Sequence, residues 1–90
     1  MGKTRIILSE HVIKDKIPLL KSDGWNVNES TIKEMIKKPK WRGTTVYKQP
    51  TAMGLLNDNY ILRIVFNEKD GIIFVVTVHT AKRGRYESTK

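Results

Sequence analysis

Two strand-forming segments in the second half of the chain constrain the fold more than any other feature. Tyr60–Phe66 and Ile72–Thr80 are rich in β-branched and aromatic residues, and only a short polar stretch separates them. A three-residue loop, Lys69-Asp70-Gly71, would place Gly71 at the left-handed position that such loops require. The sequence therefore predicts an antiparallel β-hairpin.

The hydrophobic pattern also predicts the register of this hairpin. With that loop, six apolar residues face one another on one side of the sheet: Phe66 opposite Phe74, Ile64 opposite Val76 and Leu62 opposite Val78. The other side carries Arg63 opposite Thr77 and Ile61 opposite His79. A slip of one residue would mix the two sets, so we expect this register to be selected.

The first third of the chain predicts a strand followed by an interrupted helix. Arg5–Leu8 is a short β-branched run, and the Ser9 hydroxyl is suited to cap a helix that begins there. Pro18 removes a backbone amide and crowds the preceding turn, which predicts a kink or two short helical pieces before Asp23-Gly24 ends the element. The apolar residues at helical spacing are Ile13, Ile17 and Leu20.

A second helix has clearer signals at both ends. Asn28 is a good N-cap, and Val27 and Ile32 occupy the positions of a hydrophobic staple. The apolar stripe consists of Ile32, Met35 and Ile36, and Pro39 ends the helix.

Beyond Pro39 the pattern favours strands. Trp41–Lys48 is rich in strand formers, whereas Gln49–Asp58 contains Pro50 and Gly54 and is expected to be irregular. The predicted element order is β-α-α-β-β-β. We therefore expect an α+β fold with a mainly antiparallel sheet and two helices packed on one face.

Length and composition narrow the possible classes of protein. The 90 residues correspond to a single domain, 1–90, in which residues 87–90 are expected to form a flexible tail. The absence of cysteine excludes disulfides, thiolate zinc sites, iron–sulfur clusters and cysteine nucleophiles. With two histidines, and only Asp15 near His11 at helical spacing, we expect neither a metal site nor a cofactor. The longest apolar run, Ile72–Val76, is too short to span a bilayer, and no secretory signal is visible, so a cytoplasmic protein is expected.

The charge balance points to a polyanionic partner. Seventeen Lys and Arg residues against nine Asp and Glu residues give a net charge of +8. Such an excess attracts polyanions, of which nucleic acid is the most common, followed by anionic membrane surfaces and acidic proteins. Residues 33–48 alone carry six cations and one carboxylate, a net charge of +5.

Candidate functional residues gather near the end of the chain. The segment His79–Tyr86 contains three of the cations, and Arg63 is expected to project from the neighbouring strand on the same face as His79. Arginine can hold a phosphodiester with two hydrogen bonds, and Tyr86, His79 or Trp41 could stack on a base or transfer a proton. A solvated tail and a purely structural histidine are the alternatives. The phosphate-loop, G-x-S-x-G and H-E-x-x-H motifs are absent, so any catalysis would be metal-free acid–base chemistry.

These features together resemble the RelE/ParE-like toxin superfamily, in particular its small members and its BrnT-like branch. The similarity covers about residues 5–87. It is carried by the element order and by three segments: the helix Asn28–Pro39, the arginine-bearing strand Tyr60–Phe66 and the basic, tyrosine-containing ending Val76–Glu87.

The resemblance implies a metal-independent endoribonuclease that acts on RNA, often messenger RNA at the ribosome, and is neutralised by an acidic antitoxin. It implies that Arg63 holds the scissile phosphate, that Arg83 or Arg85 stabilises the charge on phosphorus, and that Tyr86 or His79 transfers a proton. The further cations expected to bind nucleic acid are Lys38, Lys40, Arg42, Lys48 and Lys82.

The sequence also departs from the pattern of the superfamily. The lysine pair expected on the middle strands is represented only by Lys48 and Lys40, and Pro18 interrupts the first helix. The superfamily also contains gyrase poisons, so the fold alone does not fix the reaction. A non-catalytic nucleic-acid-binding module and a protein-interaction domain of the same fold are the alternative hypotheses.

Overall fold

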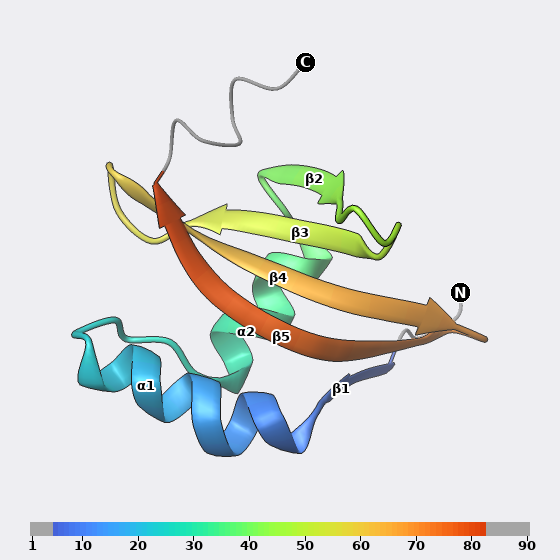
Figure 1. Ribbon diagram of the computed structural model, residues 1–90, viewed down its shortest axis with the longest axis horizontal. Coiled ribbons are helices and arrows are strands. Elements are labelled where there is room, and N and C mark those ends of the chain that lie inside the picture. Colours follow the sequence, from blue (N-terminus) through green and yellow to red (C-terminus); the bar gives the residue numbers. More distant parts are fainter. Residues whose placement is uncertain (1–4, 83–90) are drawn as a thin grey trace.

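A computed structural model describes residues 5–82 as one five-stranded sheet with helices on one side (Figure 1). The strand order is β1-β5-β4-β3-β2; β1 is parallel to β5, and all other neighbours are antiparallel. In chain order the elements are β1 (Arg5–Leu8), a π-helical segment η1 (Val12–Lys16), α1 (Ile17–Ser22), α2 (Glu29–Lys37), β2 (Trp41–Thr44), β3 (Pro50–Leu55), β4 (Tyr60–Lys69) and β5 (Ile72–Lys82).

The core lies between the helices and one face of this sheet. Val12 and Leu20 from the first helical segment and Ile32 from α2 are buried. They belong to one cluster with residues of the central strands, among them Leu62, Ile64, Val75 and Val78. The predicted α+β class, the mainly antiparallel sheet and the placement of the helices on one face are confirmed.

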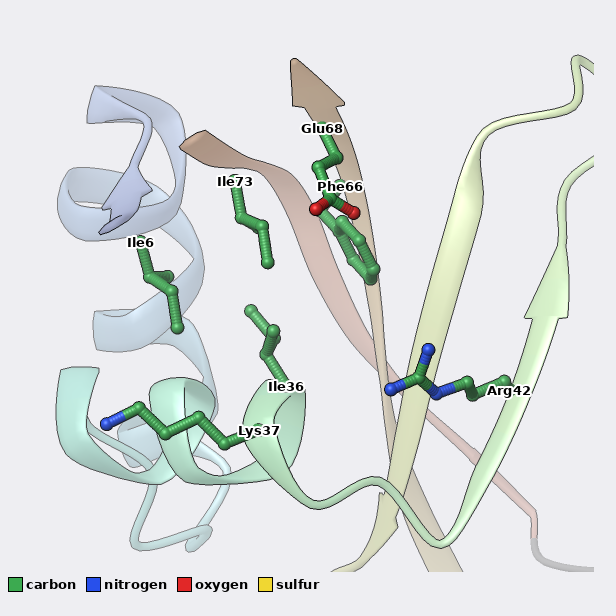
Figure 2. Close-up of a pocket in the computed structure, with 7 residues that line it drawn as sticks. All are labelled: Ile6, Ile36, Lys37, Arg42, Phe66, Glu68 and Ile73. Atoms are coloured by element: carbon green, nitrogen blue, oxygen red, sulfur yellow. The ribbon is translucent and has the colours of Figure 1, made fainter. Parts of the chain in front are cut away.

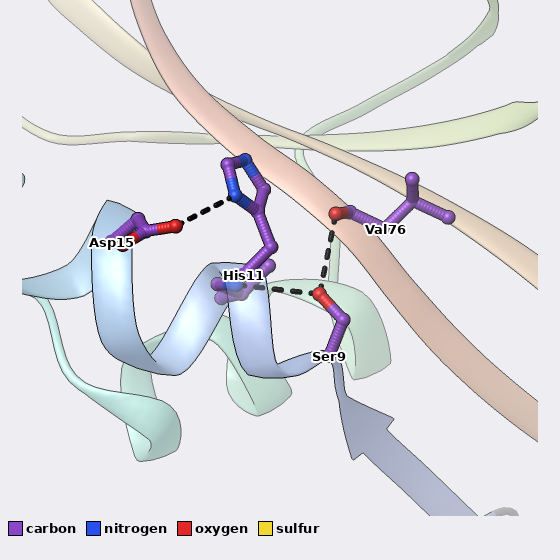
Figure 3. A network of polar contacts seen from close by, with 5 residues as sticks. Ser9, His11, Asp15 and Val76 are labelled. Carbon is purple, nitrogen blue, oxygen red and sulfur yellow. Dashed lines mark hydrogen bonds and ion pairs between the residues drawn. The ribbon is translucent and has the colours of Figure 1, made fainter.

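The first helical element is continuous, and the interruption predicted from Pro18 takes the form of a change of helix type. Its start is fixed by Ser9, whose Oγ accepts from the backbone N–H of Val12 and donates to the carbonyl of Val76, both at 3.3 Å (Figure 3). The π-helical segment then continues into α1 with helical backbone at Lys16 and Ile17, and the change of helix type falls beside Pro18, which has no amide to donate to the preceding turn. Gly24, at φ +94°, follows the end of α1.

The start of α2 is capped as predicted. The Asn28 Oδ1 accepts from the backbone N–H of Thr31 at 3.0 Å, and the Asn28 N–H donates to the Thr31 Oγ1 at 3.4 Å. Val27 and Ile32, the staple residues, are both fully buried.

Replacing Asn28 by alanine is expected to lower the free energy of unfolding by about 1 kcal/mol, because the Thr31 amide loses its acceptor. For a domain of this size, that corresponds to a fall in melting temperature of roughly 4–8 °C. Asn28→Ser, which retains a capping oxygen, is the control. A thermal unfolding curve for Asn28→Ala that overlays that of the parent would contradict the assigned cap.

The segment expected to be irregular forms a central strand of the sheet. Pro50–Leu55 is β3, which pairs with both β2 and β4. Pro50 is the first residue of the strand, a position that proline tolerates. Gly54 allows α2 to approach closely, since a Cβ there would lie 2.9 Å from the Cγ and Sδ of Met35. Pro50 and Gly54 were the reasons to expect an irregular segment, and both have structural roles within the strand.

The strand expected over Trp41–Lys48 is shorter, because the chain turns after Thr44. The Thr45 Oγ1 accepts from the backbone N–H groups of Tyr47 and Gln49 at 3.2 and 3.1 Å. Lys48 takes a left-handed conformation, φ +65°. Residues 45–49 therefore form a loop, named here the β2–β3 loop.

The predicted register of the β4–β5 hairpin is wrong. Asp70 and Gly71 have φ values of +53° and +79°, which fit a two-residue type I′ turn rather than a three-residue loop, so Lys69 pairs with Ile72. A bulge between Val65 and Phe66 then shifts the pairing by one more residue.

The shifted register changes which side chains meet. Phe66 pairs with Val75, Ile64 with Val78 and Leu62 with Thr80. Phe74, expected in the core, lies on the face away from the helices and is 44% exposed. Arg63 is opposite His79 rather than Thr77.

Candidate nucleic-acid interface

The sheet face away from the helices, named here the open face, carries both central candidate residues. Because β2 to β5 pair side by side, four residues form one row across it: Trp41, Met53, Arg63 and His79. Directly paired residues of neighbouring strands project on the same side of a sheet. The prediction that Arg63 and His79 share a face is confirmed.

Arg63 and His79 are in direct contact. The Arg63 Nη1 lies 3.4 Å from the His79 Nε2, and both side chains are partly buried. A guanidinium can only donate hydrogen bonds, so a bond between these atoms requires an unprotonated Nε2 and, in a neutral ring, a proton on Nδ1. The pair thus places a cation beside a nitrogen that can accept a proton.

The cavity beside this pair has a volume of ≈ 570 Å³, within the range of about 300–1,000 Å³ that is typical of small-ligand sites. It is lined by Arg63 and His79, by their sheet neighbours Val65, Val76 and Thr77, and by residues of the β2–β3 loop together with Thr44. In this loop, Val46 and Tyr47 are 89% and 83% exposed. The sequence placed Tyr47 inside a strand, and no local pattern marked it as part of a site, because the Thr45 side chain that holds the loop is itself a strand former.

The other predicted cations are spread over the surface. Lys48 lies in the β2–β3 loop, next to the cavity-lining Tyr47, and Lys82 ends β5 opposite Tyr60. Lys38 is exposed at the end of α2. The Lys40 Nζ lies 5.6 Å from the centre of the Trp41 ring, at the β2 end of the cross-strand row.

Arg42 lies on the other side of the sheet. It is paired with Ala52, a core residue, and lines a different cavity with Ile36 and Phe66. The structure therefore brings Arg63 and His79 together but does not bring Arg42 to them. Arg83, Arg85 and Tyr86 lie outside the described residues.

Two further properties concern residues 5–82. Within this range, no group of three His, Cys, Asp or Glu residues could hold a metal ion; the contact between His11 Nδ1 and Asp15 Oδ2, at 3.1 Å, is exposed on the first helical segment (Figure 3). No helix in the same range is long and apolar enough to cross a membrane.

Comparisons of the chain with protein-family models, curated proteins and solved structures found no match. A function is therefore inferred from the residues of the open face.

Proposed function

We propose that this chain is a RelE-like, metal-independent endoribonuclease toxin that cleaves single-stranded RNA on the open face. The observation that carries the proposal is the contact between Arg63 and His79 at the edge of a cavity of ≈ 570 Å³. The net charge of +8 supports a polyanionic substrate. Messenger RNA on cytoplasmic ribosomes is the proposed substrate, and an acidic antitoxin is the proposed partner.

The two side chains supply complementary parts of the reaction. Arg63 donates hydrogen bonds to the non-bridging oxygens of the scissile phosphate and stabilises the charge that develops there. A phosphate bound to Arg63 takes over the hydrogen bond that Arg63 otherwise donates to the His79 Nε2. The Nε2 can then accept the proton of the 2′-hydroxyl.

Cleavage by the 2′-hydroxyl of the RNA requires no further reactant. The 2′-oxygen forms a bond to phosphorus, and the bond from phosphorus to the 5′-oxygen breaks. The products are a 2′,3′-cyclic phosphate and a 5′-hydroxyl. The 5′-oxygen takes up a proton. The resemblance assigns proton transfer to Tyr86 or His79, and with His79 as the base we propose Tyr86 as the donor.

The shape of the site favours an unpaired strand. The exposed Tyr47 ring borders the same cavity as Arg63, and Val65 and Val76 add apolar surface. Stacking on an aromatic side chain requires a base that is free of a duplex stack.

Incubation with end-labelled single-stranded RNA, and with translating ribosomes, tests the proposal when EDTA is present. We expect fragments that end in a 2′,3′-cyclic phosphate, and RNA binding that weakens as the salt concentration rises. Salt-sensitive binding without cleavage above that of the Arg63→Ala variant would replace the enzyme by a non-catalytic binding module. The absence of both binding and cleavage would overturn the proposal.

Tyr47→Ala is expected to weaken single-stranded RNA binding by about fivefold or more, because stacking on an aromatic side chain contributes roughly 1–3 kcal/mol per base. Tyr47→Phe keeps the ring and should bind like the parent. Fluorescence anisotropy with a labelled oligonucleotide measures both variants, with Tyr47→Phe as the matched control. An affinity of Tyr47→Ala equal to that of Tyr47→Phe would remove the Tyr47 ring from the interface.

A further inference from the structure

A second cavity lies on the helix side of the sheet and shares no lining residue with the first. Its volume is ≈ 350 Å³, and it lies between α2 and strands β1, β4 and β5 (Figure 2). Four apolar side chains line it: Ile6, Ile36, Phe66 and Ile73. Three of these, Ile36, Phe66 and Ile73, are buried, so they form a fixed apolar wall.

Charged side chains from α2, β2 and β4 complete the lining. Figure 2 shows the Arg42 guanidinium pointing toward the apolar side chains, Glu68 beside Phe66, and the Lys37 side chain extending away from Arg42 on the far side of Ile36. Among residues 5–82 the ion pairs are His11–Asp15 and Lys14–Glu10, so neither Lys37 nor Arg42 is neutralised by a carboxylate of this part of the chain.

We propose that this cavity binds an apolar monocarboxylate, a small molecule with a phenyl ring or short alkyl chain and one carboxylate group. Arg42 would receive the carboxylate, since a guanidinium can donate two parallel hydrogen bonds to it. The ring or chain would pack on Ile36, Phe66 and Ile73. The volume lies within the range of small-molecule sites.

The same lining disfavours a nucleic-acid strand. Four of the seven lining side chains are apolar, and Glu68 would repel a second phosphate. A ligand with one negative charge and an apolar body matches a single guanidinium beside an apolar wall. This proposal does not depend on the proposed function of the open face.

The NMR signals of isoleucine methyl groups can show whether a ligand binds in this cavity. A sample labelled at isoleucine δ1 methyls is titrated with 3-phenylpropionate up to about 10 mM, a range that detects weak ligands. We expect the NMR signals of Ile6, Ile36 and Ile73 to shift, whereas that of Ile13, which does not line the cavity, stays in place. The uncharged 3-phenylpropionamide has nearly the same shape and should bind at least about fivefold more weakly.

Two arginine variants separate a built site from general attraction to a basic protein. Arg42→Gln is expected to weaken 3-phenylpropionate binding by about fivefold or more. Arg63→Gln makes the same change on the opposite face and should leave this binding unchanged; the methyl spectrum of each variant shows that it is folded. The absence of shifts, equal binding of the amide, or equal effects of the two substitutions would each overturn the proposal.

Discussion

Replacing His79 by alanine is expected to lower the rate of RNA cleavage by about 10²–10⁴-fold, the usual contribution of a general base. Arg63→Ala should lower it by about 10²–10³-fold, because a donor to the developing charge on the phosphate is lost. Single-turnover cleavage of a defined single-stranded RNA measures both rates. The two residues act on one step, so the double variant should be much less impaired than the product of the single effects predicts.

A matched variant separates catalysis from binding. In His79→Gln, the side-chain amide oxygen can accept the hydrogen bond from Arg63, but it cannot serve as a base at neutral pH. We expect this variant to bind RNA like the parent and to be inactive. Arg63→Ala should instead weaken binding as well as cleavage, since the guanidinium contacts the phosphate before and during the reaction. A His79→Gln variant that cleaves as fast as the parent would remove the imidazole from the mechanism.

The parts of the fold that the sequence predicted well depend on interactions between near neighbours. Asn28 bonds to Thr31 three residues later, and the Ser9 Oγ accepts from the amide of Val12. The change of helix type beside Pro18 likewise follows from the chemistry of one residue. Each of these signals involves residues close together in the sequence, so it can be recognised without knowledge of the fold.

The parts that the sequence did not predict depend on contacts between distant segments. Gly54 reads as a strand breaker until α2 is placed beside it, with Met35 filling the space of the missing side chain. Arg42 is one residue away from the row that includes Trp41, so its face depends on where β2 begins and how it pairs. The cavity that it lines is formed by residues between 6 and 73, and no local pattern indicates it.

For the candidate site, the sequence predicted the shared face of Arg63 and His79 correctly but not their direct pairing. The alternation of apolar and polar residues placed Arg63 and His79 on one face, and the bulge between Val65 and Phe66 then made them direct partners. Between the turn and the bulge, the register is shifted by one residue from the predicted one, because the turn has two residues. This shift places Phe74 on the open face. The residues that form a bulge carry no reliable sequence signal, because the bulge depends on the twist and packing of the whole sheet.

A pair of substitutions on the β4–β5 hairpin tests this register by stability. Ile64 is fully buried opposite Val78, so Ile64→Ala is expected to lower the free energy of unfolding by about 2–5 kcal/mol. Phe74 is 44% exposed on the open face, and Phe74→Ala should cost on the order of 1 kcal/mol or less. The register predicted from the hydrophobic pattern places both side chains in the core and would make both changes severe. Urea unfolding measures the difference, with Ile64→Val, expected to cost about 0.5–1.5 kcal/mol, as the milder variant if Ile64→Ala does not fold. A Phe74→Ala variant as unstable as Ile64→Ala would contradict the two-residue turn and the bulge, and with them the direct pairing of Arg63 with His79.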